Sequence, residues 1–158
     1  MEAAEYDRIA DTFIDTVYRV ALSNCKNSAD AQDAVQNTFV KLLRSDMEFE
    51  DDEHIKRWLI KVSVNECRNI WRSFWKRNVD YMEEIEREPR FETQEKSDLY
   101  YAVMGLPIKY KSVVHLYYYE DYSVKEISDI LGVKETTIQT RLMRARKMLK
   151  QQLEEAWK

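Results

Sequence analysis

Glycine, proline, cysteine and histidine are scarce in this chain of 158 residues, which has two of each. So few glycines and prolines leave too few turns for an all-β fold and exclude a glycine-rich phosphate-binding loop. Cys25 and Cys67 cannot build a disulfide framework, and with His54 and His115 they show no metal-site spacing. Long apolar runs and the basic start of a signal peptide are also missing. We therefore expect a cytoplasmic protein with no membrane span, no metal and no cofactor.

Charged residues are abundant and unevenly distributed. The chain has 25 Lys and Arg against 29 Asp and Glu, a net charge of −4. Residues 54–77 nevertheless carry seven basic side chains and one acidic one, and residues 134–150 carry six and one. Two compact basic segments in an acidic chain indicate two separate contacts with a polyanion, while the acidic remainder limits indiscriminate binding.

Helix-forming residues dominate the composition, and apolar residues recur at helical spacing, which predicts an all-α fold. The acidic segment 80–97, which contains Pro89, shows no sustained helical stripe and is interpreted as a linker. It separates a small helical domain at residues 1–79 from a second at residues 98–158. The expected helices cover about 4–23, 28–44, 55–76, 97–105, 107–119, 123–131 and 135–153, with Ser28 and Ser97 as N-caps.

The third expected helix carries a polar face beside its apolar one. On a wheel at 100° per residue, Leu59, Val64 and Cys67 fall on the half that forms the core. A separate arc of about 120° holds cations, amides and indoles and no acid. Its members are Arg57, Trp58, Lys61, Asn65, Arg68, Asn69, Arg72, Trp75 and Lys76. Cations neutralise phosphates, amides read base edges and aromatic planes stack on unpaired bases, so the arc indicates nucleic-acid contact. An ordinary solvated basic face is the alternative.

Residues 123–149 have the pattern of a helix-turn-helix. Ser123 and Glu126 form a capping box, and Gly132 suits the left-handed end of the first helix. The second helix is expected to bury Ile138, Leu142, Ala145 and Leu149. Its opposite arc presents Thr136, Gln139, Thr140, Met143, Arg144 and Lys147. In this motif the second helix enters the major groove of DNA. A helical hairpin with a basic outer surface is the alternative.

Taken together, these segments resemble a known family. Residues 30–44 resemble conserved region 2.2 of bacterial sigma factors, and residues 55–72 resemble regions 2.3 and 2.4. Residues 106–146 resemble region 4. With no room for regions 1.1 or 3, the chain is similar to the short extracytoplasmic-function (ECF) group of the sigma-70 family. The resemblance implies a region 2 helical bundle and a region 4 helix-turn-helix.

The resemblance also implies a dissociable transcription initiation factor that binds core RNA polymerase and performs no chemistry itself. Region 2.2 is expected to dock on the polymerase β′ clamp helices through Asp33, Gln36, Asn37, Val40 and Lys41. Regions 2.3 and 2.4 are expected to recognise and melt the −10 promoter element through Trp58, Lys61, Asn65, Arg68, Asn69, Arg72 and Trp75. Region 4 is expected to bind the β flap and to read the −35 element through Thr136, Gln139, Thr140, Arg141, Met143, Arg144 and Lys147. An anti-sigma factor is a further implied partner.

Other functions remain open at this point. A stand-alone dimeric helix-turn-helix regulator would bind a palindromic duplex without polymerase, but it leaves the polar face of the third helix unexplained. A helical adaptor without a DNA role leaves the polarised last helix unexplained. An enzyme is disfavoured because the sequence shows no catalytic constellation. Tyr117, Tyr118 and Tyr119 are candidates for a flap-binding patch, with core packing as the alternative for at least one of them.

Overall fold

The computed structural model describes residues 1–77 and 90–156, with their side chains except those of 74–77. The described residues form helices joined by turns and short loops, without a strand, which confirms the predicted all-α fold. The chain divides into two compact units, Met1–Glu84 and Ile85–Lys158. Residues 80–89 of the expected linker lie outside the described residues. Residues 94–97 belong to a helix, so the expected linker extends too far.

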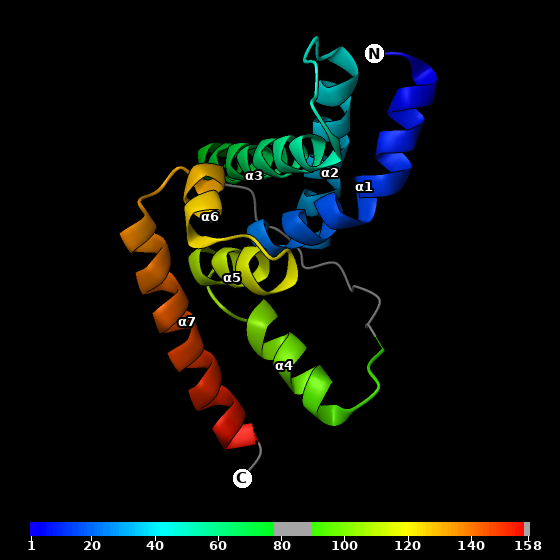
Figure 1. Ribbon diagram of the computed structural model, residues 1–158. Helices are drawn as coiled ribbons and strands as arrows, with labels where there is room; N and C mark the ends of the chain where they lie inside the picture. The colour runs from blue at the N-terminus through cyan, green and yellow to red at the C-terminus, as the bar shows by residue number, and fades with distance from the viewer. Residues whose placement is uncertain (78–89, 157–158) are drawn as a thin grey trace. The chain divides into compact units, whose positions relative to one another are not determined.

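Unit 1 contains α1 (Ala3–Asn24), α2 (Ser28–Arg44) and α3 (Asp52–Arg77), which pack against one another (Figure 1). Each helix repeats apolar side chains every three or four residues, and the three apolar stripes meet in one core. Its buried members include Ile9, Phe13, Val17, Ala31, Phe39, Leu42, Ile55, Leu59 and Cys67. Leu43, also on α2, is 49% exposed and lies outside this core.

Short polar side chains cap α2 and α3. Asn27 Oδ1 accepts the N–H of Asp30 at 2.8 Å, so Asn27 is the N-cap, and the expected cap, Ser28, is the first helical residue. The carboxylate of Asp51 accepts the N–H of His54 at 2.8 Å and so caps the start of α3. Because this cap lies so early, α3 begins at Asp52 rather than three residues later.

Unit 2 contains α4 (Gln94–Met104), α5 (Ile108–Val114), the π-helix η1 (His115–Tyr119), α6 (Val124–Leu131) and α7 (Glu135–Ala156). The long α7 packs on α4, α5 and α6 (Figure 1). Thr93 caps α4 by accepting the N–H of Lys96 at 3.1 Å, so this helix starts three residues before the expected cap at Ser97. The single helix expected over 107–119 is present as α5 followed directly by η1.

The predicted helix-turn-helix is formed by α6 and α7. Ser123 and Glu126 make both hydrogen bonds of the capping box, at 3.1 and 3.2 Å. Gly132 ends α6 with a φ of 69°, a left-handed conformation that glycine adopts without a Cβ clash. The expected stripe of α7 faces the unit's interior, with Ile138, Leu142 and Ala145 buried and Leu149 half-buried.

Candidate nucleic-acid interfaces

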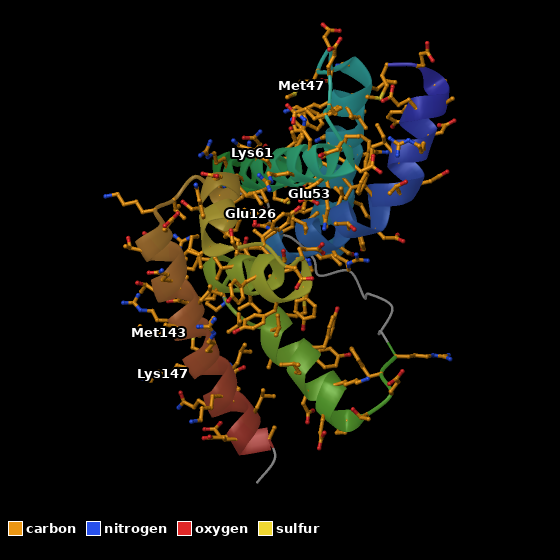
Figure 2. The ribbon with its side chains drawn as sticks, in the orientation of Figure 1. Met47, Glu53, Lys61, Glu126, Met143 and Lys147 are labelled. Carbon is orange, nitrogen blue, oxygen red and sulfur yellow. The ribbon has the colours of Figure 1, made fainter. Side chains whose placement is uncertain are left out.

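Six members of the polar arc expected on α3 are exposed in the structure. We define the α3 polar face by six exposed side chains: Arg57, Lys61, Asn65, Arg68, Asn69 and Arg72. Figure 2 labels Lys61 among them. The other side of the helix buries Leu59, Val64 and Cys67 in the core. Packing on one side therefore fixes the orientation of α3 and presents four cations and two amides together to solvent.

Of the two indoles in the expected arc, the structure describes the side chain of Trp58 but not that of Trp75. Trp58 is half-buried against the core, and its ring lies edge-on to Phe49 with 5.7 Å between ring centroids. Trp58 therefore packs at the border between the polar arc and the core. The side chain of Trp75 lies outside the described part of the structure.

A buried carboxylate lies behind the α3 polar face. Glu66 is only 6% exposed, and its Oε1 lies 2.5 Å from Nζ of Lys41 on α2. Its Oε2 accepts a hydrogen bond of 3.4 Å from Asn37 Nδ2, also on α2. Sequence reasoning missed this cluster, although Glu66 is the one acid of the basic segment 54–77. Two of the five residues assigned to polymerase docking thus contact α3.

The other three residues of that set lie at a groove between α1 and α2. Asp33, Gln36 and Val40 line it from α2, and the groove has a volume of about 560 Å³. The remaining lining residues are Tyr6, Ala10, Ile14, Asp15, Tyr18, Gln32, Val35 and Phe39. Ile14 is 45% and Val40 42% exposed, so the groove presents apolar side chains beside carboxylates and amides. The contribution of α1 was not predicted.

The outer face of α7 is polar except at one position. Thr136, Gln139, Arg144 and Lys147 are exposed, Thr140 and Arg141 are half-buried, and Met143 is 60% exposed. In Figure 2, Met143 and Lys147 lie on the side of α7 away from α4. Because the buried stripe of α7 faces the rest of unit 2, the predicted reading residues share one accessible surface.

A basic pocket of about 340 Å³ adjoins this surface. It is lined by Lys109, Tyr110, Thr136, Thr137, Thr140, Arg141 and Arg144. Burial by itself raises the pKa of the Tyr110 hydroxyl. A hydrogen bond with Arg144 and the charge of Lys109 act in the opposite direction, and the resulting pKa lies below its usual value. Three cations and several hydroxyls around one pocket suit an anionic oxygen group. Lys109 and Tyr110 were not predicted, because they lie in a segment without a basic cluster.

The three tyrosines predicted as candidates for a flap-binding patch all lie in η1. Tyr118 and Tyr119 are 49% and 53% exposed, and Tyr117 is half-buried. Arg146 Nε donates to the hydroxyl of Tyr118 at 2.6 Å, and its guanidinium lies over both the Tyr117 and Tyr118 rings. This arrangement fixes an aromatic and cationic surface on unit 2.

The described residues 1–77 and 90–156 contain no group of three or more His, Cys, Asp or Glu side chains that could hold a metal ion. In the same ranges, no helix combines the length and the apolar character needed to cross a membrane.

Models of known protein families match both units of the chain. The model described as Sigma-70 region 2 matches residues 9–77, and the model described as Sigma-70, region 4 matches residues 96–149. The two matches follow the order and the approximate bounds of the two units. They include the α3 polar face and the outer face of α7.

Individual proteins agree with the family match. The chain is 36% identical over 138 residues to RNA polymerase sigma factor SigV of Bacillus subtilis, covering 86% of this chain and 83% of that protein. It is 28% identical over 152 residues to the ECF RNA polymerase sigma factor SigM of the same organism, covering 91% and 92%. Sigma factor RpoE, solved with the anti-sigma factor NepR from Bartonella quintana, matches with a TM-score of 0.75 and 21% identity over 95% of this chain and 97% of that chain. This last likeness shows the fold alone.

Proposed function

We propose a division of promoter recognition between the two units of this chain, which belongs to the ECF group of the sigma-70 family of RNA polymerase sigma factors. As a sigma factor, it directs RNA polymerase to promoters and is not itself an enzyme. The observation that carries the proposal is the pair of exposed cationic faces, one on α3 in unit 1 and one on α7 in unit 2.

In this proposal the α3 polar face recognises the −10 element and holds its unpaired strand. Arg57, Lys61, Arg68 and Arg72 would neutralise phosphates, while the amides of Asn65 and Asn69 contact base edges. Holding an extruded base costs a few kcal/mol of unstacking, which stacking and phosphate contacts offset. Trp75 is proposed to supply stacking, and Trp58 to position the start of the face by packing on Phe49.

The outer face of α7 is proposed to read the −35 element from the major groove. The Gln139 amide suits adenine, the Met143 side chain suits the methyl group of thymine, and the Arg144 guanidinium suits guanine. Thr136, Thr140 and Lys147 flank them on the same face. The neighbouring basic pocket would hold a backbone phosphate between Lys109 and Arg141.

The groove between α1 and α2 is proposed to receive a helix of the polymerase β′ clamp. Exposed apolar side chains, Ile14 and Val40, lie beside the polar Asp33 and Gln36, as in a surface that takes up an amphipathic helix. Asn37 and Lys41 would act indirectly, because they join α2 to α3 through Glu66. The exposed rings of Tyr118 and Tyr119 are proposed to contact the β flap.

An anti-sigma factor is the proposed regulatory partner. Two similar folds are solved in complexes of this kind: RpoE with the anti-sigma factor NepR, and CnrH with the cytosolic domain of CnrY. Since core polymerase and promoter DNA are bacterial cytoplasmic components, the proposal places the chain in the cytoplasm.

Run-off transcription tests the proposal directly. The purified chain is mixed with bacterial core polymerase and a pool of promoter-like templates, and transcripts are sequenced at their 5′ ends. We expect start-site-selective transcripts whose templates share a −10 and a −35 sequence. Core polymerase alone is the control. Tight binding of the chain to a palindromic duplex, with no selective transcript, would support the dimeric regulator instead.

A further inference from the structure

The two cysteines of the chain meet in the core of unit 1. Cys25 and Cys67 are 5% and 2% exposed, and both are reduced thiols. Their sulfur atoms lie 2.7 Å apart, and a hydrogen bond joins the two thiols. Cys25 is the residue after the last turn of α1, whereas Cys67 lies within α3. The two cysteines are 42 positions apart in the sequence, so their contact is made by the packing of α1 against α3 and not by local structure.

This geometry is close to that of a covalent bond. A disulfide has an S–S distance of about 2.05 Å, so closure needs an approach of only about 0.7 Å. Cys25 has extended backbone angles, φ −111° and ψ 163°, outside α1. We therefore assign the remaining approach to Cys25, because Cys67 lies within α3.

We infer that Cys25 and Cys67 are a modification site, a thiol pair that closes reversibly to an intramolecular disulfide. The oxidant we name is a small-molecule disulfide of the glutathione class. One protein thiolate attacks it and forms a mixed disulfide, releasing one small thiol. The second protein thiolate then attacks the protein sulfur of the mixed disulfide and releases the second small thiol. Two electrons pass to the reagent, and the two thiol protons are released and taken up by the departing small thiolates.

The folded state controls when this chemistry proceeds. The hydrogen bond with Cys25, burial and nearby negative charge raise the pKa of the Cys67 thiol, and the thiolate is the reactive form. Attack on the reagent is therefore slow in the folded chain and begins in the unfolded chain. Folding then brings the second sulfur to the first, which favours the internal bond over a lasting mixed disulfide.

The expected effect of the bond is to stabilise unit 1 rather than to inactivate it. The cross-link ties the end of α1 to α3 and removes loop-closure entropy from the unfolded chain. Cys67 lies on the buried side of α3, away from the exposed Asn65 and Arg68, so the α3 polar face keeps its geometry. Oxidation should therefore raise resistance to urea while promoter opening stays unchanged.

The test refolds the full chain from urea in glutathione redox buffers, followed by alkylation and mass spectrometry. We expect an oxidising buffer to yield a product lighter by two hydrogen atoms, without a glutathione adduct. Its urea midpoint should exceed that of the reduced chain by about 1 M, and dithiothreitol should abolish the difference. Cys25→Ser and Cys67→Ser are matched controls, because each keeps one thiol and cannot form the internal bond, so the oxidising buffer should not raise its midpoint.

Two results would overturn the inference. One is a refolded wild-type chain that carries two glutathione adducts or two unreacted thiols in the oxidising buffer. The other is an internal disulfide that lowers the urea midpoint. Both are read from the wild-type chain, so a serine variant that folds poorly leaves the test intact.

Discussion

Lys41 of α2 and the buried Glu66 of α3 form an ion pair, with 2.5 Å between Nζ and Oε1. The pair joins the helix proposed to contact polymerase to the helix proposed to contact the −10 element. Asn37 adds a second contact to the same carboxylate. Glu66 is nearly buried while Lys41 is 53% exposed on its side chain, so the carboxylate depends on its partners more than the ammonium does.

Lys41→Ala should therefore destabilise unit 1, although about half of the Lys41 side chain is exposed. Removing the cation leaves a buried carboxylate with less compensation, at a cost of about 1–3 kcal/mol after allowance for solvent screening. Urea denaturation of the full chain measures the loss. Arg44→Ala, at an exposed position of the same helix, is the control and should cost much less.

Glu66→Gln tests whether the ion pair itself, and not helix packing in general, accounts for the loss of stability in Lys41→Ala. In the Lys41→Ala background it removes the uncompensated charge, so the double variant should lose less stability than the sum of the single variants. Additive losses would mean that the two side chains do not interact energetically.

Val40→Asp should weaken binding to core polymerase while leaving the fold intact. Val40 is 42% exposed and lines the groove between α1 and α2, so a carboxylate there is tolerated in the free chain but meets an apolar partner surface unfavourably. Leu43→Asp is the matched control, because Leu43 is an exposed apolar residue of the same helix that does not line the groove. Affinity is measured by titrating labelled chain with core polymerase, and equal losses in both variants would argue against the groove.

Arg72→Ala should impair promoter opening more than assembly with polymerase. Arg72 lies on the α3 polar face, and losing one charge-assisted contact of about 1.4 kcal/mol corresponds to about a tenfold loss. Permanganate reactivity of unpaired thymines measures opening. Lys96→Ala removes one charge from α4, outside both proposed DNA faces, and should leave opening unchanged. A parallel loss of core binding in Arg72→Ala would contradict its assignment to DNA.

Sequence periodicity and short motifs predicted the features that are determined within a single helix or turn. The exposed side of α3, the capping box at Ser123 and the turn at Gly132 all follow from local spacing and are present. Contacts between helices were not predictable in this way. Glu66 reads as one acid in a basic segment until α2 is packed beside it, and the Cys25–Cys67 contact appears only when α1 and α3 meet.

Arg144 and Lys109 should respond differently to substitution, because one is proposed to read a base and the other a phosphate. Arg144 is exposed on the outer face of α7 and also lines the basic pocket, whereas Lys109 reaches the pocket from α5. Arg144→Ala should relax preference at one −35 position by about 1–3 kcal/mol. Lys109→Ala should weaken binding to all templates alike. It should also lower the slope of log K against log salt concentration by about one, since one counterion fewer is released.

Run-off transcription on a −35 library at several salt concentrations measures both effects in one experiment. Tyr110→Phe is the matched variant, because it removes the hydroxyl that lines the pocket with Arg144 but keeps every charge there. It should reproduce part of the lost preference without changing the salt dependence. If Arg144→Ala instead lowers every template equally, Arg144 contacts a phosphate and base reading falls to Gln139 and Met143, whose side chains stand exposed on the same helix.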